Sequence, residues 1–142
     1  MRDSFVKKID FVFFNENKIR VAVYEERNDS HRKPEIKSGK VLLNPTERDA
    51  LKNIIPLPQV SIGGSVLKLP ELWINVIDKT YIWCRNKSEI FFQAVRRKYN
   101  GEHYHKICSD YSISQPHFFN IIDKARMYAA MQAAQFGLIH VD

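Results

Sequence analysis

The chain has 142 residues, of which 44% are hydrophobic and 27% are charged, as in an ordinary globular protein with one domain, or a small domain and an appendage. No stretch approaches the ~20 apolar residues that cross a bilayer, and the N-terminal stretch lacks the features of a signal peptide, so we expect a cytoplasmic protein without membrane contact. The net charge of +6 favours an anionic partner, most commonly nucleic acid. The two cysteines, Cys84 and Cys108, fall on predicted buried helix faces, which indicates a reducing compartment and no disulfide framework.

Two apolar segments near the N-terminus, Ile9–Phe14 and Ile19–Tyr24, are rich in β-branched and aromatic residues. The polar segment Asn15–Lys18 between them is typical of a turn, so the sequence predicts a β-hairpin. Because two strands alone are marginally stable, we expect this hairpin to pack on helices, to take a third strand or to pair with a second copy of the chain.

The next segment, Arg27–Lys40, is polar and lacks apolar periodicity, and it predicts a basic loop. Its charged side chains are Arg27, Asp29, Arg32, Lys33, Glu35, Lys37 and Lys40, five positive against two negative. Two interpretations stay open: a solvated loop, or a basic arm that contacts a phosphate backbone or RNA.

Two further elements are predicted before residue 69. The segment Asn44–Glu47 is typical of a capped helix start, and that helix is expected to end near Asn53. Val60–Ile62 and Val66–Leu69 flank Gly63-Gly64, and this arrangement predicts a small hairpin.

A long helix is predicted from Pro70-Glu71 to about Lys87. Its apolar face is formed by Trp73, Val76, Ile77, Tyr81 and Cys84. We place the main boundary near residue 69, between an N-terminal β-containing region, 1–69, and a helical domain, 70–142.

The stretch Ser88–Phe136 predicts three amphipathic helices. Ser88 is a candidate N-cap of the first helix, Asn100-Gly101 ends it, and Ser114 is a candidate N-cap of the third. The predicted inner faces are Phe91, Ala94, Val95 and Tyr99 in the first helix, Tyr104, Ile107, Cys108 and Tyr111 in the second, and Phe118, Ile121, Ile122 and Ala125 in the third. Helices joined by such short links pack on one another. The predicted fold class is therefore α+β, mainly α, with a C-terminal three-helix unit preceded by a helix and an N-terminal β-hairpin region.

Residues 102–124 resemble a helix-turn-helix, with apolar residues at the buried spacing of that motif: Ile107, Tyr111, Ile113, Phe118 and Ile121. Cys108 stands where the motif carries a small residue, and Ser112 stands where its turn usually has glycine. With the preceding helix, residues 88–136 resemble the promoter-binding C-terminal domain of sigma factors and small phage late-gene regulators, including Q-type antiterminators. The resemblance covers about the last third of the chain. It implies a transcription regulator whose partners are double-stranded DNA and RNA polymerase.

A major-groove reader needs a helix whose outer face presents side chains that pair with base edges. With Phe118 inward, the outer face carries His117, Asn120 and Lys124, and it is flanked by Gln115 and Phe119. The base-reading candidates are Gln115, His117, Asn120 and Lys124. The two amides can pair with adenine, and the lysine can meet phosphate or guanine. The candidate DNA backbone contacts are Arg96, Arg97, Lys98 and Lys106. The competing interpretation is an ordinary solvated helix face, on which Asp123 would oppose phosphate.

The third helix is predicted to continue to Phe136, before Gly137. Its small residues, Ala129, Ala130, Ala133 and Ala134, allow the close approach of another helix. That helix belongs either to the Trp73–Cys84 stretch of the same chain or to a second copy in a homo-oligomer.

No catalytic constellation stands out in the sequence, and we expect neither an enzyme nor a cofactor. A metal site at His103, His105 and Cys108 is not expected, because residues 103 and 105 point ~200° apart on a helix and Cys108 belongs to the inner face. The alternative to a regulator is a non-enzymatic assembly or protein-interaction module, such as a small terminase-like phage packaging subunit.

Overall fold

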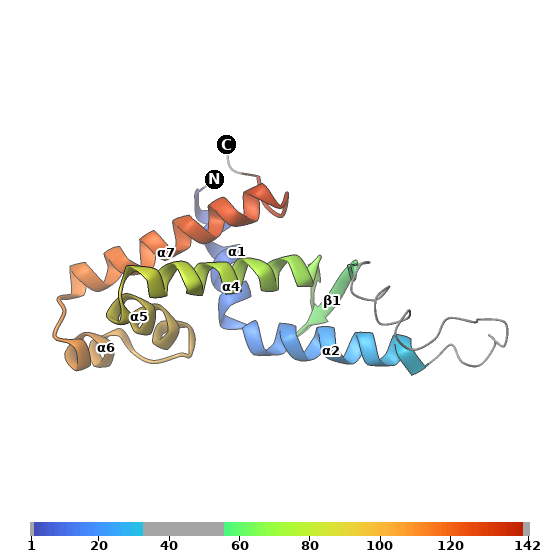
Figure 1. Cartoon of the computed structure of the whole chain (residues 1–142), viewed down its shortest axis with the longest axis horizontal. Helices are drawn as coiled ribbons and strands as arrows, with labels where there is room; N and C mark the ends of the chain where they lie inside the picture. The colour runs from blue at the N-terminus through green and yellow to red at the C-terminus, as the bar shows by residue number, and fades with distance from the viewer. Residues whose placement is uncertain (1, 33–55, 141–142) are drawn as a thin grey trace. The chain divides into compact units, whose positions relative to one another are not determined.

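The computed structural model describes residues 2–32 and 56–140 of the chain (Figure 1). The fold is mainly helical with one small two-stranded antiparallel sheet, so the predicted α+β, mainly α class is confirmed. The helices are α1 (Arg2–Phe14), α2 (Glu16–Arg32), α4 (Pro70–Lys87), α5 (Glu89–Tyr99), α6 (Tyr104–Tyr111) and α7 (Gln115–Gln135), and the strands are β1 (Gln59–Ile62) and β2 (Ser65–Lys68). No helix in the described ranges is long and apolar enough to cross a membrane.

Contacts group the chain into two compact units. Unit 1 comprises Met1–Glu16 and Leu72–Asp142, and unit 2 comprises Asn17–Glu71. The end of unit 2 lies close to the boundary expected near residue 69. The first helix, however, groups with the C-terminal helices rather than with the segment that follows it, so chain order alone does not define the units.

The predicted β-hairpin near the N-terminus is wrong, because α1 contains its first segment and α2 its second. Ile9, Val12 and Phe13 are buried, at spacings of three and four residues that put side chains on one face of a helix. In α2, Ile19 is buried while Val21 is exposed, whereas a strand would put both on the same face. Short apolar runs do not by themselves distinguish a buried strand from a buried helix.

Aromatic packing in unit 1 stabilises α1 as a helix. The centre of the Phe13 ring is 5.7 Å from that of Tyr81 and 5.3 Å from that of Tyr99. The expected four-residue turn after α1 is reduced to Asn15, whose backbone and side-chain N–H groups both donate to the Phe11 carbonyl oxygen. One helix therefore follows the other almost directly.

The predicted small hairpin in unit 2 is confirmed. Its register pairs Val60 with Leu67 and Ile62 with Ser65, and the first three of these side chains are buried. The turn residues Gly63 and Gly64 have φ values of 54° and 86°, a left-handed pair that glycine adopts without a Cβ clash.

The basic loop expected from Arg27 to Lys40 is helical as far as Arg32, so this part of the prediction is wrong. Arg27 donates to both carboxylate oxygens of Glu71, at 2.5 and 3.1 Å, and Glu71 also accepts from the Leu57 N–H at 3.0 Å. This tertiary ion pair stabilises a helical turn that the polar sequence of the segment does not predict. The rest of the segment, and the helix predicted from residue 44 to 53, lie outside the described residues.

The C-terminal helices of unit 1 follow the predicted pattern in part, because four residues expected on inner faces are only half-buried: Phe91, Tyr104, Cys108 and Tyr111. The expected inner residues of α4 are all buried: Trp73, Val76, Ile77, Tyr81 and Cys84. Ser88 caps α5 by accepting from the Phe91 N–H at 3.0 Å, and Gly101 follows α5 with a φ of 94°. The buried side chains are Ala94, Val95 and Tyr99 in α5, Ile107 in α6, and Phe118, Ile121, Ile122 and Ala125 in α7. These three helices pack on one another, and the chain turns back from α6 into α7 (Figure 1).

The carboxylate of Asp10 in α1 joins three helices. Its Oδ1 accepts from the Tyr99 hydroxyl of α5 at 2.6 Å and from Nε of Arg126 in α7 at 3.0 Å. Its Oδ2 accepts from Nη2 of Arg126 at 2.8 Å. Burial raises the pKa of the Tyr99 phenol, and the Asp10 carboxylate raises it further, so the hydroxyl stays protonated and donates at neutral pH.

The small side chains of α7 are used inside unit 1. Three of the four alanines are buried, namely Ala129, Ala130 and Ala133, and α7 packs on α1 and α5. It also reaches α4, where the Trp83 and Tyr128 rings stack with centres 4.6 Å apart. Helices of the same chain therefore occupy the alanine face, and a homo-oligomer, which stays a prediction, would need other side chains.

Asp10→Asn is expected to lower the free energy of unfolding by about 2 kcal/mol, because hydrogen bonds to a charged group are stronger than neutral ones and Arg126 would lose its counter-charge. Urea unfolding followed by circular dichroism measures the change. Asp123→Asn is the matched control, because Asp123 approaches the same arginine at 3.5 Å but is exposed. Equal losses in the two variants would contradict the joining role of Asp10.

Candidate nucleic-acid interface

The turn between α6 and α7 is held by local geometry. Ser112 ends α6 with φ 54° and ψ 44°, the left-handed conformation in which glycine is usual. Ser114 caps α7 as predicted, since its Oγ accepts from the His117 N–H at 3.2 Å, and Pro116 occupies the first turn of the helix, where its missing N–H costs nothing. The start of α7 is therefore fixed by its own sequence.

The first half of α7 presents a polar row to solvent. All four base-reading candidates are exposed: Gln115, His117, Asn120 and Lys124. Phe118 and Ile121 are buried on the other side of the helix, and Phe119 beside the row is 41% exposed. The structure thus exposes all four candidates, with His117, Asn120 and Lys124 on one side of α7 and Gln115 in its first turn, about 160° from His117 around the axis. Base reading by them stays a prediction.

All four DNA backbone candidates have partners within unit 1. Arg96 Nη1 donates to a carboxylate oxygen of Glu16 at 2.9 Å, and Arg97 bonds to two carboxylates of its own. Lys98 is half-buried, and burial lowers the pKa of its ammonium group. Lys106 differs in exposure: it forms an ion pair with Asp110 at 3.8 Å, but its side chain is 65% exposed. Of the four, Lys106 is therefore the best placed to meet a phosphate.

Arg97 links the end of α5 to α6 through hydrogen bonds. Its Nε and Nη2 donate to Oε1 of Glu102 at 2.9 and 2.6 Å, and Nη2 also donates to Oδ2 of Asp110 at 2.6 Å. The guanidinium lies over the Tyr111 ring, 5.3 Å from its centre. These hydrogen bonds lower the pKa of both carboxyls. A phosphate approaching Arg97 would have to compete with two carboxylates, so the arginine acts mainly in positioning α6.

Rings at the start of α6 cluster with Phe119 of α7. His103 and His105 are exposed, whereas Tyr104, which was expected on the inner face, is half-buried. The ring centres of His103 and His105 are 4.9 Å apart, those of His103 and Tyr104 are 4.7 Å apart, and Tyr104 is 5.2 Å from Phe119 of α7. Nδ1 of His103 accepts from the His105 N–H at 3.2 Å, which orients the first ring. Exposed rings of this kind can stack on bases. The sequence signal was the aromatic run His103–His105 itself.

Charge on the interface is nearly balanced. Lys106 and Lys124 are exposed there, and so are the carboxylates of Asp110 and Asp123. Among residues 2–32 and 56–140, no three or more His, Cys, Asp or Glu side chains gather in a way that could hold a metal ion. The chemistry that this face offers is hydrogen bonding and ring stacking more than charge attraction.

Comparisons with known protein families, curated proteins and solved structures find no match for this chain. The functional proposal therefore depends on three features of unit 1: the exposed polar row of α7, the aromatic cluster at the start of α6, and the turn that joins the two helices.

Ser112→Gly is expected to raise the free energy of unfolding by about 0.5 kcal/mol, because relief of the left-handed strain exceeds the entropy that glycine adds to the unfolded chain. Thermal or urea unfolding measures it. Ser109→Gly is the control, since Ser109 is an exposed residue inside α6, where glycine destabilises a helix by about 0.5 kcal/mol. A loss of stability in both variants would contradict strain at Ser112.

The hydrogen bonds of Arg97 with Glu102 and Asp110, here called the Arg97 cluster, should stabilise the packing of α6 in a pH-dependent way. Hydrogen bonds from Arg97 hold the pKa values of Glu102 and Asp110 below their ordinary values of 4.5 and 3.8. Because the folded-state pKa is the lower one, the stabilisation is present above the unfolded-state pKa and is lost as pH falls through the folded value. Carboxyl carbon shifts in an NMR titration should show both midpoints rising in Arg97→Gln. Lys87→Gln, outside the cluster, should leave them unchanged, and unchanged midpoints in Arg97→Gln would contradict the assignment.

Proposed function

We propose that the chain is a nucleic-acid-binding transcription regulator that engages double-stranded DNA through the first half of α7. A helix can read the major groove only when its outer side chains are not needed by the protein core. The observation that supports the proposal is the division of α7 into a buried apolar side and an exposed polar row that starts directly after a short turn.

The chemistry of the row suits base edges. Gln115 and Asn120 carry amides that donate and accept, which is the pairing that adenine offers in the major groove. His117 and Lys124 add donors at the two sides of Asn120. Within the described part of the chain, no hydrogen bond occupies the side-chain amide of Asn120. Its hydrogen-bonding capacity is therefore available to a partner.

Phosphate contacts would come from the exposed lysines Lys106 and Lys124, which set the position of α7 on the duplex. The exposed ring of Phe119 can meet a thymine methyl group. A second contact with RNA polymerase, implied by the resemblance to sigma factors and antiterminators, belongs to the same proposal. So does a cytoplasmic location, which we expect from the composition of the chain.

Duplex binding tests the proposal directly. We expect the purified chain to bind random-sequence duplex DNA with an affinity that falls as salt rises, because lysine contacts release counterions. Selection from a duplex library should then give a preferred sequence, measured by fluorescence anisotropy. Asn120→Ala should weaken binding to that sequence by about tenfold, since a bidentate amide–adenine pair contributes about 1–3 kcal/mol of discrimination. Lys124→Ala should weaken all duplexes alike and reduce the salt slope by about 1.

Gln135→Ala is the matched control, because Gln135 is an exposed amide at the far end of the same helix, about 22 Å from Asn120 along the axis. It should leave affinity and sequence preference unchanged. The proposal fails if no salt-dependent duplex binding is found, or if Asn120→Ala and Gln135→Ala behave alike. A defined oligomeric complex in size-exclusion chromatography, formed without DNA and unaffected by Asn120→Ala, would instead favour the assembly module.

A further inference from the structure

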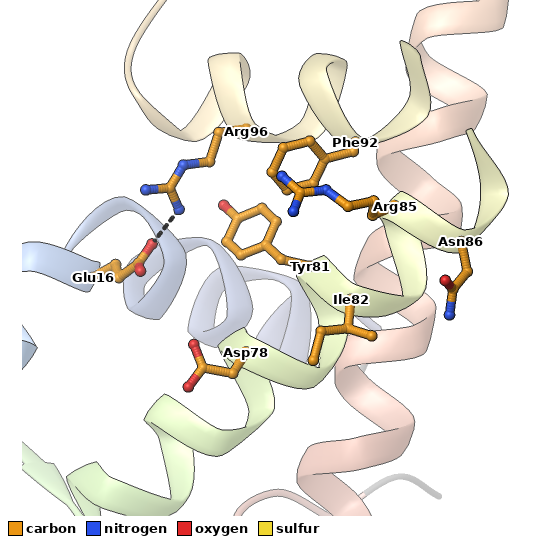
Figure 2. Close-up of a pocket in the computed structure, with 8 residues that line it drawn as sticks. All are labelled: Glu16, Asp78, Tyr81, Ile82, Arg85, Asn86, Phe92 and Arg96. Carbon is orange, nitrogen blue, oxygen red and sulfur yellow. Dashed lines mark hydrogen bonds and ion pairs between the residues drawn. The ribbon is translucent and has the colours of Figure 1, made fainter. Parts of the chain in front are cut away.

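A cavity of about 460 Å³ lies in unit 1, away from the polar row of α7, and is lined by α4, α5 and the first residue of α2 (Figure 2). Figure 2 shows two arginines, Arg85 of α4 and Arg96 of α5, beside two aromatic rings of these helices. Arg85 was not a candidate contact with DNA, and Arg96, which was one, is bonded to Glu16.

The two helices exchange cation–π contacts across this cavity. The guanidinium carbon of Arg85 lies 4.0 Å from the centre of the Phe92 ring, and that of Arg96 lies 5.0 Å from the centre of the Tyr81 ring. The Tyr81 and Phe92 rings meet edge to face with centres 5.8 Å apart. A guanidinium that lies over a ring loses little freedom when it binds a ligand.

Several N–H and O–H groups of the residues that line the cavity have no acceptor among the described residues. Within the described ranges, no carboxylate or carbonyl accepts from Arg85, and Arg96 uses one nitrogen for Glu16. The Tyr81 side chain is 9% exposed, and its buried hydroxyl lacks a hydrogen-bond partner among these residues. Figure 2 shows this hydroxyl directed between Arg96 and Glu16. Burial raises the pKa of Tyr81, which keeps the hydroxyl a donor.

Two carboxylates also line the cavity, and they limit how much negative charge a ligand bound there can carry. Glu16 is bonded to Arg96 at 2.9 Å, and Asp78 lies on α4 one turn before Ile82. With two arginines and two carboxylates, the lining has no net charge. It therefore suits a ligand with a single compact anionic group better than a polyanion such as a nucleic acid.

The apolar part of the lining indicates what the anionic group is attached to. Ile82 is 63% exposed and lies at the rim of the cavity beside Arg85 (Figure 2). Together with the edge of Phe92 it forms an apolar surface next to the guanidinium. We infer that this cavity is a binding site for a small molecule with one oxyanion group, a phosphate or a carboxylate, on a compact apolar body, with Arg85 as the main anion contact and Ile82 as the apolar contact.

The full chain can be titrated with phenyl phosphate, benzoate and benzylammonium, with binding measured by calorimetry and by NMR of the arginine Nε–H signals. We expect one or both oxyanions to bind and to shift the signals of Arg85 and Arg96, and benzylammonium to bind at least tenfold more weakly. The comparison of phenyl phosphate with benzoate identifies the preferred oxyanion. Binding of the cation at equal strength, or of neither oxyanion, would overturn the assignment.

Variants separate the two contacts. Arg85→Gln should weaken oxyanion binding at least tenfold, while Lys87→Gln, an exposed cation of the same helix that lies over the Trp83 ring and does not line the cavity, should leave it unchanged. Ile82→Ala, at an exposed position where folding is not threatened, should weaken phenyl phosphate and leave inorganic phosphate unaffected. Equal effects of Arg85→Gln and Lys87→Gln would show a general charge effect and would overturn the site, whereas the DNA experiments above would be untouched.

Discussion

The carboxylate of Asp10 is the point at which α1, α5 and α7 meet. Its two oxygens accept three hydrogen bonds from Tyr99 and Arg126. The Phe13 ring of the same helix contacts Tyr99 and Tyr81, so polar and apolar contacts of α1 act on the same neighbours. Because Arg126 lies in α7 directly after the candidate interface, the orientation of that interface depends on a helix from the opposite end of the chain.

Three arginines of unit 1 are used inside it. Arg96, Arg97 and Arg126 each bond to carboxylates of the same unit, and partly buried pairs of this kind position helices more than they attract distant partners. The exposed faces that remain are polar and aromatic. A partner would therefore be selected by hydrogen bonding and ring stacking, with a few lysines such as Lys106 adding attraction for phosphate.

The separation of the two proposed sites follows from the geometry of α4 and α5. These helices meet through Tyr81 and Phe92, and each ring supports an arginine of the other helix. The cavity that results is lined by rigid helical residues, whereas the face of α7 begins at a turn. The two proposed sites thus lie on different surfaces: one is an open hollow between α4 and α5, the other the solvent-exposed side of α7.

The sequence by itself determined the elements from the β1–β2 hairpin to α7, the caps at Ser88 and Ser114, and the outward direction of Asn120, because capping and helical periodicity act between residues a few positions apart. It did not determine that Ile9–Phe14 is helical, since a short apolar run fits a strand or a helix equally well until it packs. Only the tertiary structure decided that Asp10 meets Tyr99 and Arg126, which are 89 and 116 residues away, and that Arg97 is held by carboxylates. Such pairings depend on where whole helices pack, and no local pattern of residues encodes them.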